Sequence, residues 1–184
     1  MSGYFDQSCD FDEFTQIAHG GQDVFLAKFN LSGSVIWARN FGGPGFENPW
    51  SMAVDAAGKI YLTGHFEQTA DFWGMTLTTS GQLDVFVVAT DSSGQVVWAK
   101  QAGDNRSHGG FALAFGPAND VVVGGAFSSR TIFDGVAYTS ANSGTDAFVA
   151  QLTSPLALAT ISLRSVPLGI QLEIGGVVGK TVII

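Results

Sequence analysis

Hydrophobic residues occur along this chain in short runs that glycine, serine, aspartate and asparagine separate. In the central part, β-branched and aromatic residues mark four such runs, at residues 51–55, 59–66, 84–91 and 95–101. Runs of this length and composition predict strands. The segments "DAAG" and "DSSG" join them in pairs, with aspartate opening a tight turn and glycine closing it. The pattern therefore predicts an all-β chain built from antiparallel hairpins.

The same pattern returns along the chain at an offset of 61 residues. Asp23-Val24-Phe25 returns as Asp84-Val85-Phe86 and, after one inserted residue, as Asp146-Ala147-Phe148. Trp37 returns as Trp98. Repeats of this kind mark arrays whose units bury a core by stacking on each other, and a unit of four antiparallel strands is typical of a β-propeller blade.

The repeat defines the expected domain organisation. We expect a β-propeller-like array over residues 1–153, with a partial blade, a full blade at 51–101 and a partial blade at 111–153. Two to three blades are fewer than the four to eight that close a ring. The chain is therefore expected either to be a piece of a longer protein or to complete its ring as a homo-oligomer.

Three phrases of the repeat carry a resemblance to a known family. They are "DVFLAKF" with its copy "DVFVVAT", "SGSVIWA" with its copy "SGQVVWA", and "AVDAAGKIYLTGHF". Over residues 1–153 the chain resembles the bacterial β-propeller repeat family of secreted and surface proteins. The resemblance implies an extracellular or cell-surface location in a bacterium.

The last part of the chain departs from the repeat. Residues 154–160 are interpreted as a linker, and residues 161–184 resemble the start of a PEGA-type β-domain. The matching features are Ser165-Val166-Pro167, an alternating strand at 170–174 and a Gly175-Gly176 turn. This second resemblance implies a wall-associated or glycan-associated context.

Charge narrows the range of partners. Sixteen acidic against eight basic residues give a net charge of −8, which disfavours nucleic acid and anionic membrane surfaces. No apolar stretch is long enough for membrane insertion. Cys9 is the single cysteine, so an internal disulfide is excluded.

The connections between strands fall into two groups at opposite ends of each blade. Tight turns share one end, and the long connections at 42–50, 67–83, 103–110 and 128–145 share the other. Long loops on a rigid scaffold commonly carry binding residues. The ligand-binding candidates on this side are aromatic, acidic and histidine residues: Trp50, Trp73, Glu47, Asp71, Asp104 and His108.

Residues that recur in each copy are assigned structural roles. Asp23, Asp84 and Asp146 precede the same strand of each blade and are expected to accept hydrogen bonds from loop backbone N–H groups, ligand binding being the alternative. Trp37 and Trp98 are expected to pack between blades. Trp50 and Trp73 do not recur, which leaves both packing and sugar stacking open for them.

Neither a nucleophile elbow nor an HExxH or paired-cysteine motif occurs, and residues 51–55 and 111–115 offer chiefly small and apolar side chains. We therefore expect no catalytic residue and no cofactor, with an acidic, calcium-tolerant rim as the alternative. The expected function is a non-catalytic surface module that binds glycan or protein. The alternatives are a propeller-type lyase, lactonase or glycosidase, and a purely structural stalk.

Overall fold

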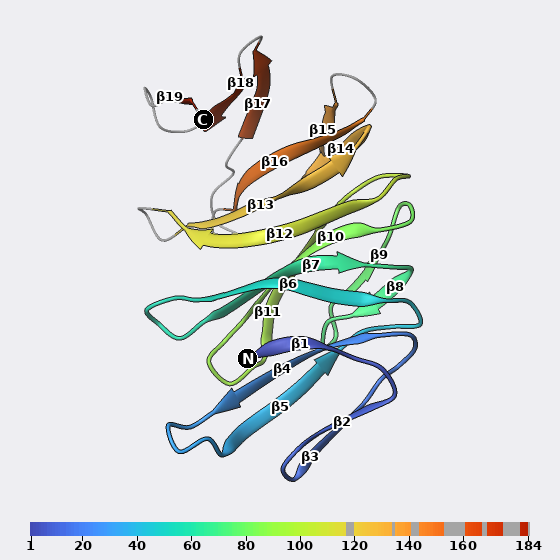
Figure 1. The fold of residues 1–184 in the computed structure, drawn as a ribbon, viewed down its shortest axis with the longest axis vertical. Coiled ribbons are helices and arrows are strands. Elements are labelled where there is room, and N and C mark those ends of the chain that lie inside the picture. Colours follow the sequence, from blue (N-terminus) through green and yellow to red (C-terminus); the bar gives the residue numbers. More distant parts are fainter. Residues whose placement is uncertain are drawn as a thin grey trace.

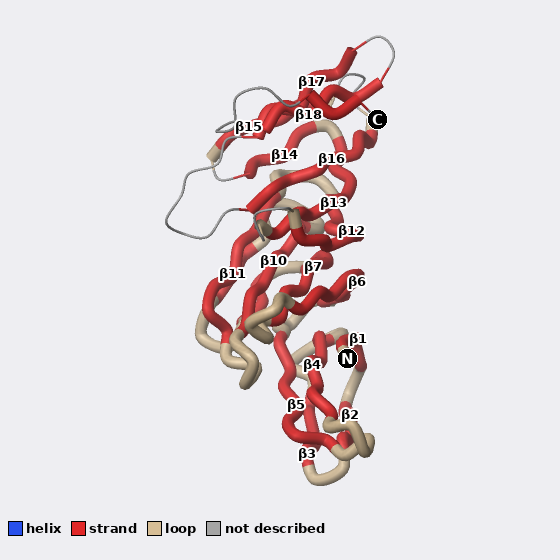
Figure 2. The backbone as a smooth tube through the Cα atoms, turned by 90° about the vertical axis from the view of Figure 1, so that its left-hand side faces the viewer, coloured by secondary structure: helices blue, strands red, loops and turns tan. Residues whose placement is uncertain are grey.

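The structure is a computed structural model that describes residues 1–116, 120–133, 135–140 and 144–152, and the backbone of three later strands. The described residues form strands, turns and loops, arranged as several small antiparallel sheets of which none closes on itself. Three of these sheets follow one another along the long axis of the molecule (Figures 1 and 2). The predicted all-β class is confirmed.

The central sheet has four strands in the order β11-β10-β7-β6. Its strands are β6 (Glu47–Val54), β7 (Ile60–Phe66), β10 (Asp84–Thr90) and β11 (Val96–Ala102). They coincide with the four predicted runs except at one end, because β6 begins four residues before the predicted start at residue 51. The segment "ENPW" was expected in a loop, since its proline and acidic residue are typical of loops, and this expectation is wrong.

A three-stranded sheet flanks the central one on each side. The first has the order β1-β4-β5, with β1 (Ser2–Phe5), β4 (Asp23–Phe29) and β5 (Val35–Phe41). The third has the order β12-β13-β16, with β12 (His108–Phe115), β13 (Val121–Ser128) and β16 (Thr145–Leu152). Within the described part of the chain, the first sheet has no counterpart of β6 and the third has none of β11.

Each unit also contains a small hairpin that the sequence did not predict. The hairpins are β2 (Ser8–Phe11) with β3 (Phe14–Ile17), β8 (Thr69–Asp71) with β9 (Thr76–Thr78), and β14 (Arg130–Phe133) with β15 (Val136–Thr139). The segments expected as plain loops at 67–83 and 128–145 are thus partly paired. In Figure 1 the β8–β9 and β14–β15 hairpins lie toward the right, the β2–β3 hairpin lies below the first sheet, and the tight turns lie to the left.

The tight turns follow the predicted chemistry. Asn30, Asp55 and Asp91 each accept two backbone N–H groups from the turn that they open, at 2.9–3.0 Å. Gly33 and its counterparts Gly58 and Gly94 have φ between 81° and 87°. The fourth expected turn, at 116–119, lies largely outside the described residues.

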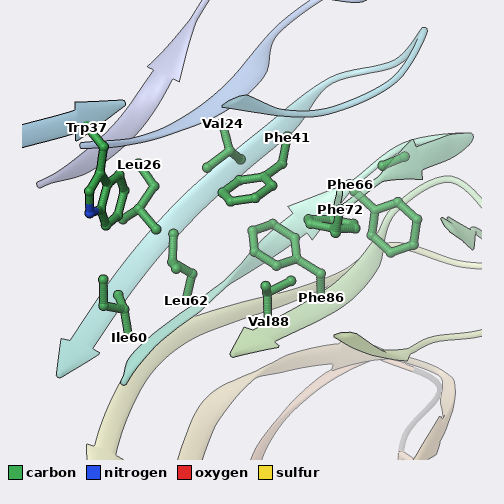
Figure 3. Packing of buried hydrophobic residues seen from close by; sticks show 11 residues of the cluster. Val24, Leu26, Trp37, Phe41, Ile60, Leu62, Phe66, Phe72, Phe86 and Val88 are labelled. Carbon is green, nitrogen blue, oxygen red and sulfur yellow. The ribbon is translucent and has the colours of Figure 1, made fainter. Parts of the chain in front are cut away.

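Apolar side chains fill the space between consecutive sheets. The cluster between the first and central sheets includes Trp37, Phe41, Leu62, Phe72 and Phe86 (Figure 3). Phe72, from the β8–β9 hairpin, has its ring centroid 5.1 Å from that of Phe86 and 6.2 Å from that of Phe41. The hairpin therefore covers the core that two sheets share.

The recurrent tryptophans pack between sheets to different degrees. Trp37 is buried, and its ring lies against Gly94 of the β10–β11 turn, where an added Cβ would be 2.9 Å away. Trp98 is partly buried on the second cluster, with its ring 6.1 Å from Tyr61. That cluster joins the central and third sheets through residues such as Val87 and Val123.

The last described strands form a separate sheet of order β17-β18-β19, with β17 (Ile161–Val166), β18 (Gly169–Ile174) and β19 (Thr181–Ile183). The strand predicted at 170–174 falls within β18. The expected linker at 154–160 and the Gly175-Gly176 turn lie outside the described residues. The described part of the chain contains no helix that is long and apolar enough to cross a membrane.

Candidate functional site

The sheets are joined at two junctions, which are named here by position. The first junction joins the sheet of β1, β4 and β5 to the central sheet, and the second joins the central sheet to that of β12, β13 and β16. At the first, the Glu47 N–H donates to the Gln22 carbonyl at 2.8 Å; at the second, the His108 N–H donates to the Leu83 carbonyl at 2.9 Å. The same main-chain contact is thus repeated 61 residues later.

A second main-chain contact ties each loop to the hairpin of the next unit. Gly42 bridges to Asp71 at the first junction, and Gly103 bridges to Ile132 at the second. Gly42 and Asp71 exchange N–H···O bonds of 3.2 and 2.9 Å. The long connections between β5 and β6 and between β11 and β12 are therefore held against β8 and β14.

The recurrent aspartates organise these loops from inside. Asp23 and Asp84 are fully buried and accept the backbone N–H groups of His19 and Ser80, at 3.1 and 3.0 Å. A Cβ added at Gly42 would lie 2.3 Å from the Asp23 carboxylate. The contact is of the kind expected from the sequence for the recurrent aspartates, while Asp146, at the start of β16, is half-buried.

The two buried aspartates differ in how fully their oxygens are bonded. Asp23 also accepts bonds from His19 Nδ1 at 2.6 Å and Asn40 Nδ2 at 3.1 Å. Asp84 Oδ1 is buried without a hydrogen-bond partner. Burial and, less strongly, the charge of Asp104 raise the pKa of Asp84 to about 6. The hydrogen bond from the Ser80 N–H lowers it but does not cancel this shift.

Glu47 and His108 occupy the same position of the repeat, at the start of β6 and β12. Glu47 Oε2 accepts the Gly43 N–H at 2.8 Å, and His108 Nε2 accepts the Asp104 N–H at 3.0 Å. Both side chains are buried. Because β6 and β12 begin before the predicted strands at 51–55 and 111–115, they bring a carboxyl and an imidazole group to the junctions.

Burial shifts both groups toward their neutral forms. It raises the pKa of Glu47 to about 8, although the bond from Gly43 opposes the shift. Burial lowers the pKa of His108, although the neighbouring Asp104 carboxylate raises it in part. Glu47 Oε1 and His108 Nδ1 remain buried without hydrogen-bond partners.

His108 also lies next to a carboxylate, which is the geometry that a general base would need. Its Nε2 is 3.3 Å from Asp104 Oδ1. However, Nε2 already accepts the Asp104 backbone N–H, so in the neutral ring the proton is on Nδ1 and no bond to the carboxylate forms. The ring is also only 3% exposed. The arrangement closes a loop, as Glu47 does at the first junction.

The two candidate tryptophans have different surroundings. Trp50 lies in β6, is 57% exposed and donates from Nε1 to His65 Nδ1 at 2.9 Å. Trp73, at the tip of the β8–β9 hairpin, has the Arg39 guanidinium 4.0 Å from its ring centroid. The structure gives each ring its own neighbours and does not combine them into one platform.

The remaining acidic candidate, Asp71, has a local role. Its Oδ1 accepts the Gly74 N–H at 2.6 Å and so closes the β8–β9 turn. Its carboxylate is exposed. Within the residues that the structure describes, no group of three or more histidine, cysteine, aspartate or glutamate side chains is placed to hold a metal ion.

A cleft of about 500 Å³ opens at the second junction. It lies between the loop after β11 and the start of β14, and its polar lining residues are Ser80, Asp104, Asn105, Arg106, Ser129 and Arg130. Arg130 Nη1 is 4.0 Å from Asp104 Oδ2. Of the sequence-predicted candidates, the cleft includes Asp104, while Arg106 and Arg130 were missed.

Part of the chain is similar to a longer bacterial protein. No protein-family profile matches the chain. Over 134 residues the chain is 27% identical to the regulatory protein FlaEY of Caulobacter vibrioides. The match covers 71% of this chain and 14% of FlaEY, so the chain spans about a seventh of that relative.

Proposed function

We propose that this chain is part of a β-propeller-like array that acts as a non-catalytic recognition module, binding glycans through its long connections. The observation that carries the proposal is the contrast between the uniform and variable parts of the repeat. Both junctions use the same main-chain contacts. The side chains of the connections differ between copies, as with Asp104 and Arg106 against Gly43 and Gly45. Variable loops on a repeated scaffold commonly form binding surfaces.

Exposed aromatic residues favour a glycan over a structural role alone. Trp50 and Trp73 are 57% and 40% exposed, and each is next to a polar side chain that restrains it. An indole ring held in this way provides an apolar face for a sugar ring together with neighbouring hydrogen-bonding groups. A protein partner and a structural stalk are the alternatives.

Location and context rest on similarity. The resemblance of residues 1–153 to bacterial surface repeats supports a place outside the cell, and the relative FlaEY supports a setting within a much longer protein. A regulatory protein, as its name describes FlaEY, can act by recognition without catalysis. We infer the same of this chain.

Open sheet edges support a larger assembly. In the described residues β1 pairs with β4 alone, and β16 pairs with β13 alone. An edge of this kind presents unpaired N–H and C=O groups to another strand. The proposed ring is therefore completed by further blades or by further copies. Light scattering of the purified chain tests the second route, because a strict monomer contradicts it.

A glycan array with matched variants tests the recognition proposal. Trp50→Ala and Trp73→Ala each remove one exposed ring, and we expect at least one of them to weaken binding about tenfold, since a stacked ring contributes on the order of 1 kcal/mol or more. Leu31→Ala is the control, because Leu31 is fully exposed on the β4–β5 turn at the opposite end. Absence of binding across a broad array contradicts the proposal.

The contact of His108 with Asp104 favours a second candidate, a propeller-type lyase, lactonase or glycosidase. That candidate requires the buried ring to reach substrate. Product analysis after incubation with any glycan bound on the array distinguishes the two. Turnover that His108→Gln abolishes, without loss of binding, supports the enzyme; unchanged glycan supports the recognition module.

A further inference from the structure

The loops at the two junctions meet the next unit in different ways. At the first junction, a Cβ added at Gly43 would lie 1.9 Å from the Thr69 carbonyl oxygen, and one added at Gly45 would lie 2.7 Å from Glu67 Cβ. The glycines therefore let this loop rest directly on the chain that leads into β8. No larger residue fits there without displacing the backbone.

At the second junction the same positions carry side chains. Asp104 stands where Gly43 does and Arg106 where Gly45 does, while Arg130 replaces Thr69 on the opposite side. All three of these residues line the cleft of about 500 Å³. A contact that glycine closes at one junction is thus replaced by a cleft with charged walls at the other.

The cleft is lined by a carboxylate that the protein bonds incompletely. Asp104 is 8% exposed, and its Oδ1 is buried without a hydrogen-bond partner. Its Oδ2 faces Arg130 at 4.0 Å, a distance too long for a hydrogen bond. Oδ1 is enclosed beside His108 Nε2, 3.3 Å away, so the carboxylate is open to a ligand donor through Oδ2 on the Arg130 side.

The cleft also concentrates positive charge in an acidic protein. Arg106 and Arg130 are two of only eight basic residues in a chain of net charge −8, and both line this one space. The Arg130 side chain is 49% exposed, which leaves its guanidinium accessible to a ligand. Guanidinium groups bind carboxylates in a planar, two-point geometry.

We propose that this cleft binds a uronate-type acidic saccharide, with the sugar carboxylate on Arg106 and Arg130 and a ring hydroxyl donating to Asp104 Oδ2. Ser80 and Ser129 lie in the same lining and offer hydroxyls to the remaining sugar oxygens. The volume is within the range of small-ligand sites. The proposal rests on the glycan-recognition function above and specifies its substrate class.

The charges favour a sugar acid over an amino acid or a peptide C-terminus. Both kinds of ligand bring a carboxylate for the arginines and a donor for Asp104. An ammonium group at Asp104 Oδ2 would, however, lie beside the Arg130 guanidinium, whose repulsion offsets the attraction of the carboxylate. A neutral hydroxyl donor carries no such cost.

Calorimetric titration with trigalacturonate, and with its methyl ester as the uncharged counterpart, tests the proposal. We expect the ester to bind about tenfold or more weakly, and the affinity for the acid to fall as salt is raised. Arg106→Gln with Arg130→Gln should reduce affinity for the acid by about tenfold per arginine. The charge-matched control is Lys28→Gln with Lys59→Gln, which removes two lysines outside the cleft lining and should leave affinity unchanged.

Asp104→Asn is the third variant, since it retains the shape of the side chain and weakens the acceptor. Thermal unfolding of each variant confirms that it is folded. Equal binding of acid and ester, or binding that the arginine substitutions leave unchanged, overturns the proposal. So does stronger binding of glutamate or of a tripeptide carboxylate in the same cleft.

The outcomes separate this proposal from the general function. Binding of neutral glycans on the array, with no affinity for trigalacturonate, contradicts the acidic-saccharide assignment and leaves the recognition function intact. No binding of any glycan contradicts both.

Discussion

The two junctions between sheets share the same main-chain contacts but have different polar side chains. At the first, Asp23 accepts three hydrogen bonds and the neighbouring loop closes through glycine. At the second, Asp84 accepts one bond from Ser80, and Asp104 Oδ1 has no partner. Apolar clusters and repeated main-chain contacts join the sheets at both junctions. The polar side chains at these positions can therefore differ between the junctions without changing how the sheets are joined.

The largest loss of unfolding free energy should come from replacing Gly42 or Gly103 by alanine, which places a methyl group between the loop and the buried aspartate. A Cβ at Gly42 would lie 2.3 Å from the Asp23 carboxylate, and a Cβ at Gly103 would lie 2.0 Å from that of Asp84. Either carboxylate must move or the backbone must. Asp23 is held by three bonds and Asp84 by one, so Gly42→Ala should cost more, about 4 kcal/mol against about 2 kcal/mol.

Chemical denaturation of the two variants measures this difference. Gly144→Ala is the matched control, because nothing lies within 4 Å of the added Cβ there. Equal losses at Gly42 and Gly103 would show that the clash alone sets the cost and that the bonding of the aspartate does not matter.

The junctions should also respond to pH in opposite directions. Glu47 has a folded pKa of about 8 against an ordinary value of 4.5, so it favours folding while protonated, and stability falls as pH rises from about 4.5 through 8. The pKa of His108 is lowered by burial, so stability falls as pH drops below 6.5. Glu47 thus weakens the first junction as pH rises, and His108 weakens the second as pH drops, while Asp84, with its pKa raised to about 6, opposes His108 between about pH 3.8 and 6.

Two isosteric variants isolate these contributions in a pH series of unfolding free energies. Glu47→Gln keeps the acceptor for Gly43 and should be more stable than the parent at pH 8, by about 3 kcal/mol at most, since each pKa unit corresponds to about 1.4 kcal/mol and local rearrangement relieves a part. His108→Gln should flatten the acid side of the profile. Parallel profiles for the parent and both variants would contradict the assignment.

The sequence predicted the parts of the fold that depend on local chemistry. The turns at Asn30, Asp55 and Asp91 were predicted because an Asx side chain and a following glycine specify them. The central strands were predicted because their apolar runs are bounded by such turns. The β8–β9 and β14–β15 hairpins were missed, since strands this short carry no alternation that separates them from loop.

The site was only partly accessible to sequence reasoning. The 61-residue offset places Glu47 and His108 at the same position of the repeat. However, the proline and glycine residues nearby suggested loops rather than the starts of strands. Arg106 and Arg130 line the same cleft because a loop of one sheet faces the hairpin of the next. Their placement depends on how the sheets stack, which no pattern within either segment specifies.

The smallest changes in unfolding free energy should come from replacing each buried aspartate by asparagine, which compares Asp23 and Asp84 directly. Asp23→Asn leaves one acceptor oxygen where the carboxylate served His19 and Asn40, and should cost about 2 kcal/mol. Asp84→Asn keeps the acceptor for Ser80 and removes a buried charge whose pKa is already raised to about 6. At pH 7 it should therefore be within about 0.5 kcal/mol of the parent, because the lost charge had no second partner. A cost at Asp84 as large as that at Asp23 would mean that the unpartnered oxygen does bind a donor, such as water, in solution.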